Sequence, residues 1–321
     1  MTDRETANPE ILDLLPRLAD DDAGVRRIAL IELADLEDPE GLPWLTDALV
    51  ADAAAEVRAE AARLLEAWEE PDVVQALCAA LADPAEPVRL AAAQSLSELK
   101  SLDAGELILP WVRHADAFVR TSALRALREL RLDAAATPAL QALEDGDAGV
   151  RREAVGILGW LKRSDALPAL ARLASDDPDT DVRRAATGAL GLASDASVLP
   201  ALRAALADEA WQVREEAATT LGKVGLDEAG PALLAALDDS YWQVRLRAAR
   251  ALGRLRHRPA APGLAGLLVH GIANLRKEAA LALGELGDAW AVPALRAAEA
   301  DGDPEVRKAV RIALVQLHGA A

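Results

Sequence analysis

One short pattern returns at intervals of 31 or 32 residues along the whole sequence of 321 residues. Its marker is the dipeptide Val-Arg, and Leu275-Arg276 stands at the single place where the series would otherwise be interrupted. The marker begins at residues 25, 57, 88, 119, 150, 182, 213, 244, 275 and 306. A fixed period of roughly 20 to 50 residues indicates an array of similar structural units. The ten copies leave no room for a separate domain or linker, so we expect a single repeat domain over residues 1–321.

Each copy has the pattern of two helices joined by a short acidic turn. The first segment has a proline near its start and leucines at helical spacing, as in LPALRAALAD (199–208). Proline suits the first helical turn, because its missing amide hydrogen has no intrahelical partner there. The second segment places apolar residues at the marker and 4, 7, 8 and 11 places later, as in VREEAATTLGKVG (213–225). This spacing predicts a helix with one apolar stripe, ended by a glycine such as Gly225 or Gly287.

These hairpins predict an all-α fold, a right-handed α-α superhelix of about ten stacked repeats. Alanine and leucine dominate the composition, and only 3% of the residues are aromatic, which favours helices over strands. Later copies have a glycine nine places after the marker, where a missing side chain would let neighbouring helices approach closely. These glycines are Gly159, Gly191, Gly222, Gly253 and Gly284. In the fourth copy, Pro110 falls inside the first helix and should kink or shorten it.

The spacing D-x-x-x-x-V-R-x-x-A-x-x-x-L resembles the short HEAT-like repeats of phycobilisome lyase subunits and of many bacterial proteins. The resemblance covers about residues 9 to 318. It implies that the first helices face outward and that the second helices line the concave face of the superhelix.

An acid stands five residues before most markers, and an arginine follows one place after the marker. Asp208 with Arg214 and Asp239 with Arg245 are examples, whereas His114 and His270 replace the acid in two copies. Because a catalytic pair would not be repeated along an entire chain, we interpret these residues as a structural ladder. The acid can cap the turn and favour the positive end of the second helix. The arginine can bond it within the repeat or across to the next one.

The sequence contains no recognisable catalytic or metal-binding motif. His114 and His270 stand five repeats apart, which is about 50 Å at roughly 10 Å per helix layer. The acidic turn DDPDTD (176–181) lacks the glycine and bidentate glutamate of a calcium loop. The single cysteine, Cys78, lies in the apolar run VVQALCAAL, which predicts that it is a buried hydrophobic residue. We therefore expect no enzyme activity, no metal and no cofactor.

The formal net charge of −18 disfavours nucleic acid and anionic membranes as partners. No apolar stretch approaches the roughly 20 residues of a membrane span. No signal peptide is recognisable in MTDRETANPEI, and one cysteine cannot form an intramolecular disulfide. These features predict a cytoplasmic protein.

The best candidate for a binding site is the eighth repeat, where the copies differ most. Arg247, Arg250 and Arg254 share one face of its second helix without an acid among those positions. Across ten repeats, the corresponding second-helix positions, which we expect to be exposed, sum to only +2. Together with aromatic residues, these arginines could bind a carboxylate-bearing or phosphorylated partner. The candidate aromatic residues are Tyr241, Trp242, Trp211 and, in the fifth repeat, Trp160. The alternatives are a solvated charged face, and tryptophans that only pack at the turns or sideways against the solenoid.

The sequence is compatible with three functions. The first is a non-catalytic scaffold, a monomer that binds a partner protein or peptide on the concave face. The second is an enzyme subunit that handles a chromophore, as the resemblance to bilin lyases implies, with the arginines facing the propionates. The third is nucleic-acid binding, for which the small positive charge of the second-helix face is a weak basis.

Overall fold

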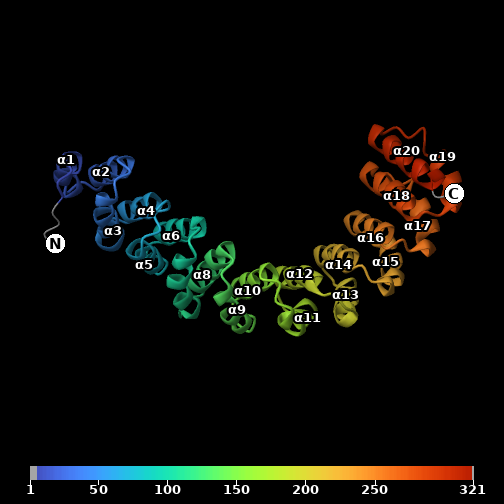
Figure 1. The fold of residues 1–321 in the computed structure, drawn as a ribbon, viewed down its shortest axis with the longest axis horizontal. Helices are drawn as coiled ribbons and strands as arrows, with labels where there is room; N and C mark the ends of the chain where they lie inside the picture. Colours follow the sequence, from blue (N-terminus) through green and yellow to red (C-terminus); the bar gives the residue numbers. More distant parts are fainter. Residues whose placement is uncertain (1–5, 320–321) are drawn as a thin grey trace. The chain divides into compact units, whose positions relative to one another are not determined.

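A computed structural model describes residues 6–319, and over these residues the chain is all α, with no β-strand. The helices form ten successive hairpins (Figure 1). The first helices of the hairpins are α1 (Pro9–Leu18), α3 (Leu42–Ala51), α5 (Pro71–Ala80), α7 (Leu102–Ile108), α9 (Ala136–Ala142), α11 (Leu167–Asp176), α13 (Leu199–Ala205), α15 (Gly230–Ala235), α17 (Ala261–Leu267) and α19 (Val292–Ala297). The second helices are α2 (Ala23–Asp35), α4 (Ala55–Leu64), α6 (Glu86–Glu98), α8 (Ala117–Leu130), α10 (Ala148–Trp160), α12 (Thr180–Ala189), α14 (Trp211–Val224), α16 (Trp242–Arg254), α18 (Ala273–Leu286) and α20 (Pro304–Gly319).

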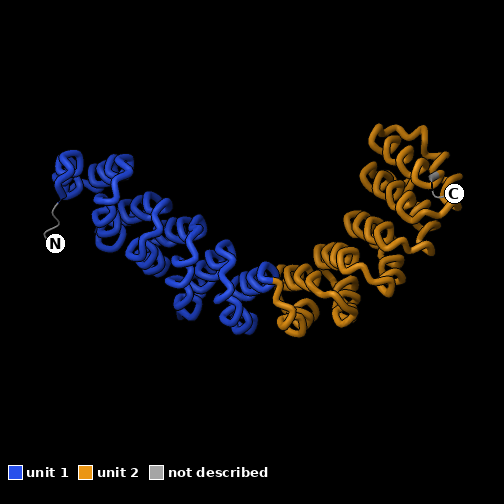
Figure 2. The backbone as a smooth tube through the Cα atoms, in the orientation of Figure 1, with its two compact units in different colours: residues 1–161 blue, residues 162–321 orange. Residues whose placement is uncertain are grey.

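The chain divides into two compact units, residues 1–161 (unit 1) and 162–321 (unit 2), each with five hairpins (Figure 2). Within each unit, every second helix packs against the second helix of the next repeat. In unit 2 the row of hairpins bends, and α12, α14, α16, α18 and α20 lie on the inner side of the bend (Figure 1). We call the surface formed by these five helices the inner face of unit 2.

The apolar stripe predicted for the second helices forms the core. From the second repeat onward, the marker residue, the residue four places later and the leucine eight places later are almost completely buried. In α14 these residues are Val213, Ala217 and Leu221. Burial of one such leucine is worth about 2 kcal/mol. The same small set of side chains, repeated along each unit, therefore supplies a continuous core.

Helix ends follow the sequence signals. Gly225 and Gly287 end α14 and α18 in the left-handed conformation, with φ of 72° and 67°. In the fourth repeat, α7 stops at Ile108, and a 3-10 helix, η2 (Leu109–Arg113), begins with Pro110 in its first turn. The predicted shortening of this helix is confirmed, because proline cannot continue the hydrogen bonding of an α-helix.

The predicted close approach of neighbouring second helices is confirmed at three glycines of unit 2. A β-carbon added to Gly222, Gly253 or Gly284 would lie within 2.8 Å of an atom of the alanine on the next second helix. At Gly191 the nearest atom, Cγ2 of Thr220, is 3.5 Å away, which is an ordinary contact. The glycines therefore permit close packing mainly between α14, α16, α18 and α20.

Candidate functional site

The acid–arginine ladder joins successive repeats. In repeat seven, Arg214 donates from Nε and Nη2 to both carboxylate oxygens of Asp239 in repeat eight, at 2.6 and 3.0 Å. Its Nη1 donates to the carbonyl of Asp208 in its own repeat, at 2.8 Å. Pairs of the same geometry are Arg26–Asp52, Arg58–Asp83, Arg120–Asp145, Arg183–Asp208 and Arg276–Asp301. The sequence allows the arginine to bond the acid of its own repeat or that of the next repeat. In these pairs it binds the carboxylate of the next repeat.

The aspartates of the ladder also cap the turns. The Asp239 carboxylate accepts a hydrogen bond from the backbone amide of Tyr241, at 2.8 Å. Burial by itself raises the pKa of Asp239, but the hydrogen bonds from Arg214 and from the Tyr241 amide outweigh it and hold the pKa below its ordinary value. The pair is therefore ionised at neutral pH and acts as a tether, with no group poised for proton transfer.

Histidine breaks this ladder in two places. Nδ1 of His114 accepts from the amide of Asp116, and Nδ1 of His270 accepts from the amide of Ile272, each at 3.1 Å. The turn keeps its cap, but the carboxylate is lost. Arg245, which precedes His270, instead donates from Nε to the carbonyl of Asp239 in its own repeat. Among the described residues Arg245 has no ion pair, so it is held differently from Arg214.

The predicted aromatic residues meet only in part. The rings of Trp211 and Tyr241 stack with centroids 5.5 Å apart and an angle of 14° between them. The Arg214 guanidinium lies 5.6 Å from the centre of the Tyr241 ring. Tyr241 is 44% exposed, whereas Trp211 and Trp242 are half-buried at the start of their helices. This aromatic pair therefore lies beside Arg214, at the edge of the acid–arginine ladder.

Two of the three arginines in the predicted row are neutralised by acids from neighbouring helices. Arg247 pairs with Glu215 of α14 at 3.0 Å, and Arg250 binds both oxygens of Glu278 of α18 at 2.7 Å. The expectation that the second-helix positions are all exposed is wrong at Glu278 and Glu153, which are 5% and 3% exposed. Arginines from the preceding repeat cover both carboxylates.

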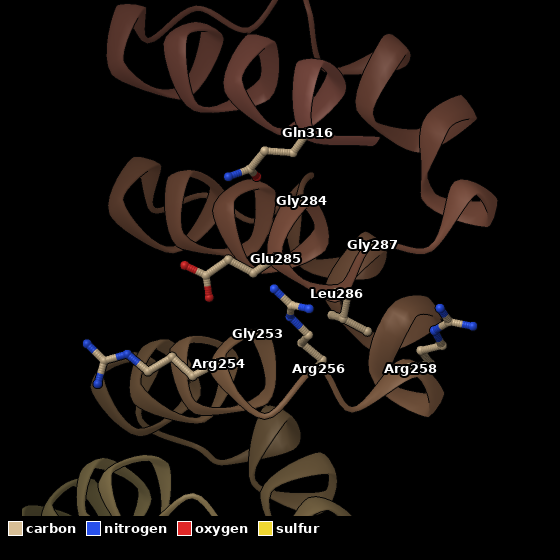
Figure 3. A pocket seen from close by; sticks show the side chains of 9 residues that line it. All are labelled: Gly253, Arg254, Arg256, Arg258, Gly284, Glu285, Leu286, Gly287 and Gln316. Carbon is tan, nitrogen blue, oxygen red and sulfur yellow. The ribbon is translucent and has the colours of Figure 1, made fainter. Parts of the chain in front are cut away.

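Arg254 has no such partner within the part of the chain that the structure describes, and it lines a pocket of about 650 Å³ beside the C-terminal ends of α16 and α18 (Figure 3). Arg256, in the loop after α16, points towards the end of α18, and Arg258 begins the 3-10 helix η9 (Arg258–Ala260). Glu285 of α18 and Gln316 of α20 complete the polar lining. Burial and the nearby Glu278 raise the pKa of Glu285, although Arg254, Arg250 and Arg256 oppose this rise.

A second, smaller hollow of about 190 Å³ lies between α14 and α16 and shares Arg254 with the first. It is lined by Ala218, Thr219, Gly222, Lys223, Arg247, Arg250, Ala251 and Arg254. The aromatic pair lies at the other end of α16, because Tyr241 immediately precedes this helix of 13 residues, which spans about 20 Å. The structure therefore separates the predicted site into an aromatic edge and a basic region. The contribution of Glu285 and Gln316 could not be read from the pattern of one repeat.

Trp160 ends α10 in unit 1 and is 52% exposed. The guanidinium of Arg131 lies 4.3 Å from its ring centre, so this tryptophan has a cationic neighbour within its own unit. It forms a candidate contact point of unit 1.

No three His, Cys, Asp or Glu side chains among residues 6–319 are grouped so that they could hold a metal ion. Cys78 is completely buried, as the sequence predicts, and burial raises the pKa of its thiol to about 12. Over the same residues, no helix has the length and apolar character of a membrane span.

The profile of the HEAT repeats matches residues 11–97, 42–128, 105–191, 174–245 and 230–315, which together cover most of the sequence. The chain is a HEAT-repeat protein. Its hairpins, its stacked second helices and its buried stripe are therefore those of a HEAT solenoid. A comparison with the curated proteins gives no significant sequence match.

Solved structures similar to this HEAT-repeat protein include an engineered protein with 21% identity and a TM-score of 0.55, over 97% of this chain and 99% of that one. Yeast importin-beta, Kap95p, seen binding RanGDP, has 15% identity and a TM-score of 0.68. That match covers 97% of this chain but 50% of Kap95p, so this chain spans about half the length of that relative. The CpcE–CpcF phycocyanin lyase of Nostoc sp. PCC7120 has 29% identity and a TM-score of 0.45, over 66% of this chain and 86% of that one.

Proposed function

We propose that this HEAT-repeat protein is a non-catalytic scaffold that binds a partner protein or peptide on the inner face of unit 2. The observation that carries the proposal is the pair of adjoining hollows that share Arg254. Their lining contains six basic residues and one acid, in a chain of net charge −18. Arg247 and Arg250 are paired with Glu215 and Glu278, so the charges left over are those of Lys223, Arg254, Arg256 and Arg258 against Glu285. Such a local reversal of charge favours a partner segment that is acidic.

The fold is consistent with this role. Kap95p, which has a similar fold, binds RanGDP and forms a complex with Nup1. A shared fold does not transfer a partner, so the identity of the partner rests on experiment. We further propose that the chain acts as a cytoplasmic monomer without a cofactor, and light scattering on the purified protein tests the monomer directly.

The test begins with purification of the chain from its native cell and identification of the proteins that co-purify. The partner is then produced separately, and its affinity for the chain is measured by calorimetry. Lys223→Glu reverses a charge in the smaller hollow and should weaken binding by about tenfold, since it replaces an attraction with a repulsion. Arg296→Glu makes the same change on α19, a first helix, and should leave the affinity unchanged.

The scaffold proposal fails if no protein binds the purified chain. It also fails if Arg296→Glu weakens binding as much as Lys223→Glu does, because the inner face would then have no special role.

A further inference from the structure

Three arginines around the larger pocket differ from the other arginines of the second-helix row. Arg247 and Arg250 each bind a carboxylate of a neighbouring helix. Among the described residues, Arg254, Arg256 and Arg258 take part in no ion pair, although the protein has 53 acidic residues. They line one hollow from three successive parts of the chain, the end of α16, the loop after it and η9. Their guanidinium groups are spread out, with Arg254 and Arg258 pointing to opposite sides of Arg256 (Figure 3).

We infer that this pocket binds the carboxylates of an acidic segment in the partner, with Arg254, Arg256 and Arg258 as the donors. This inference rests on the proposed scaffold function and specifies the chemistry that the inner face recognises.

The pocket fits a carboxylate better than a polyanion. With Glu285 ionised, its three positive charges and one negative charge sum to +2, which suits one or two single charges. The fork of a guanidinium matches the two oxygens of a carboxylate. Arg250, one turn before Arg254 in α16, already shows this match with Glu278 of α18 at 2.7 Å. A nucleic acid would also face the field of a chain with net charge −18.

Glu285 and Gln316 also affect how the pocket binds a carboxylate. Glu285 is the sole acid in the lining, so it opposes the entry of a second carboxylate and limits affinity. Gln316 has an amide that can donate a hydrogen bond to an incoming oxygen. Removal of the Glu285 charge should therefore strengthen binding, whereas removal of any of the three arginines should weaken it.

The probe is an unlabelled peptide of eight aspartates with an acetylated N-terminus and an amidated C-terminus, titrated into the full chain by calorimetry at low salt. Arg256→Gly is the sharpest variant. Arg256 has a φ of 51°, in the left-handed region where the corresponding residues of repeats seven and nine are Gly225 and Gly287. Glycine adopts this conformation freely, so the melting temperature should stay within about 3 °C of the wild type.

We expect each of Arg254→Ala, Arg256→Gly and Arg258→Ala to weaken peptide binding by about fivefold, the effect of losing one partly exposed ion pair. Glu285→Gln should strengthen binding by about threefold for the same reason. Arg296→Ala, which removes an exposed arginine from α19, should leave binding unchanged. A glycine–serine octapeptide with a free C-terminus shows whether a chain end can replace the aspartate side chains.

Several results would overturn the inference: no binding of the aspartate peptide at millimolar concentration, wild-type affinity in a folded Arg256→Gly protein, or tighter binding of an eight-nucleotide thymidine oligomer. If the native partner depends on Lys223 but the aspartate peptide does not bind, only the carboxylate pocket is refuted. If the peptide binds in the pocket but no partner protein exists, the scaffold function is refuted instead.

Discussion

The ladder between repeats should make two adjacent aspartates very unequal in their effect on stability. Asp239 binds Arg214 through both carboxylate oxygens and caps the amide of Tyr241. Asp238, the preceding residue, is exposed at the end of the 3-10 helix η8 (Ala236–Asp238). We therefore compare Asp239→Ala with Asp238→Ala, two identical chemical changes at neighbouring positions.

The expected magnitude follows from the contacts of Asp239. The side chains of Arg214 and Asp239 are only 12% and 11% exposed, so loss of the carboxylate leaves a poorly solvated guanidinium. Breaking a buried pair costs about 3 to 5 kcal/mol, and water can reach part of this edge. We expect Asp239→Ala to lower the free energy of unfolding by about 3 kcal/mol and Asp238→Ala by less than about 0.5 kcal/mol.

The assay is urea unfolding followed by tryptophan fluorescence, since Trp211 stacks on Tyr241 beside the pair. A double-mutant cycle with Arg214→Ala isolates the pairing, and its coupling energy should be about 2 kcal/mol. Equal losses for Asp239→Ala and Asp238→Ala, or a coupling energy near zero, would refute the view that the ladder tethers successive repeats.

Three further changes test other parts of the reasoning. His270→Asp restores the carboxylate that Arg245 lacks, so urea unfolding should show a gain of about 1 kcal/mol; a loss would mean that the histidine ring packs better than the restored pair. Gly284→Ala should cost about 2 kcal/mol in thermal unfolding, because its β-carbon would lie 2.7 Å from the Cα of Ala313. Gly302→Ala, with nothing within 4 Å of the added carbon, is the control; equal effects would contradict the close packing. Although burial raises the pKa of Asp239, the bonds from Arg214 and the Tyr241 amide lower it on balance. A depressed folded pKa makes the contribution of the pair complete above the unfolded value of about 4 and lost as pH falls through the folded value. Wild-type stability should therefore decline below about pH 4 more steeply than that of Asp239→Ala, and parallel declines in acid unfolding curves would argue against this assignment.

Features that depend on local spacing were predictable from the sequence. The period of the Val-Arg marker gave the ten hairpins, and the positions of the apolar residues gave the buried stripe of Val213, Ala217 and Leu221. Pro110 gave the end of α7. These predictions succeed because hydrophobic periodicity and the geometry of proline act within a few residues of the chain.

The candidate binding site was only partly predictable. Arg254 was recognised as a departure from the repeat, but Arg247 and Arg250 in the same row are neutralised. Their partners, Glu215 and Glu278, lie 32 and 28 residues away in the chain. No spacing within a single helix indicates which acid of a neighbouring helix will lie opposite a given arginine.

The sequence by itself determined the repeat, the order of the helices and the side chains that form the core, because each depends on periodicity along one helix. Only the tertiary structure decided which charges cancel and which stay available at the pocket of Arg254, Arg256 and Arg258. The physical reason is that ion pairing depends on the separation and register of adjacent second helices. In unit 2, close contacts such as that between Gly284 and Ala313 help set this register.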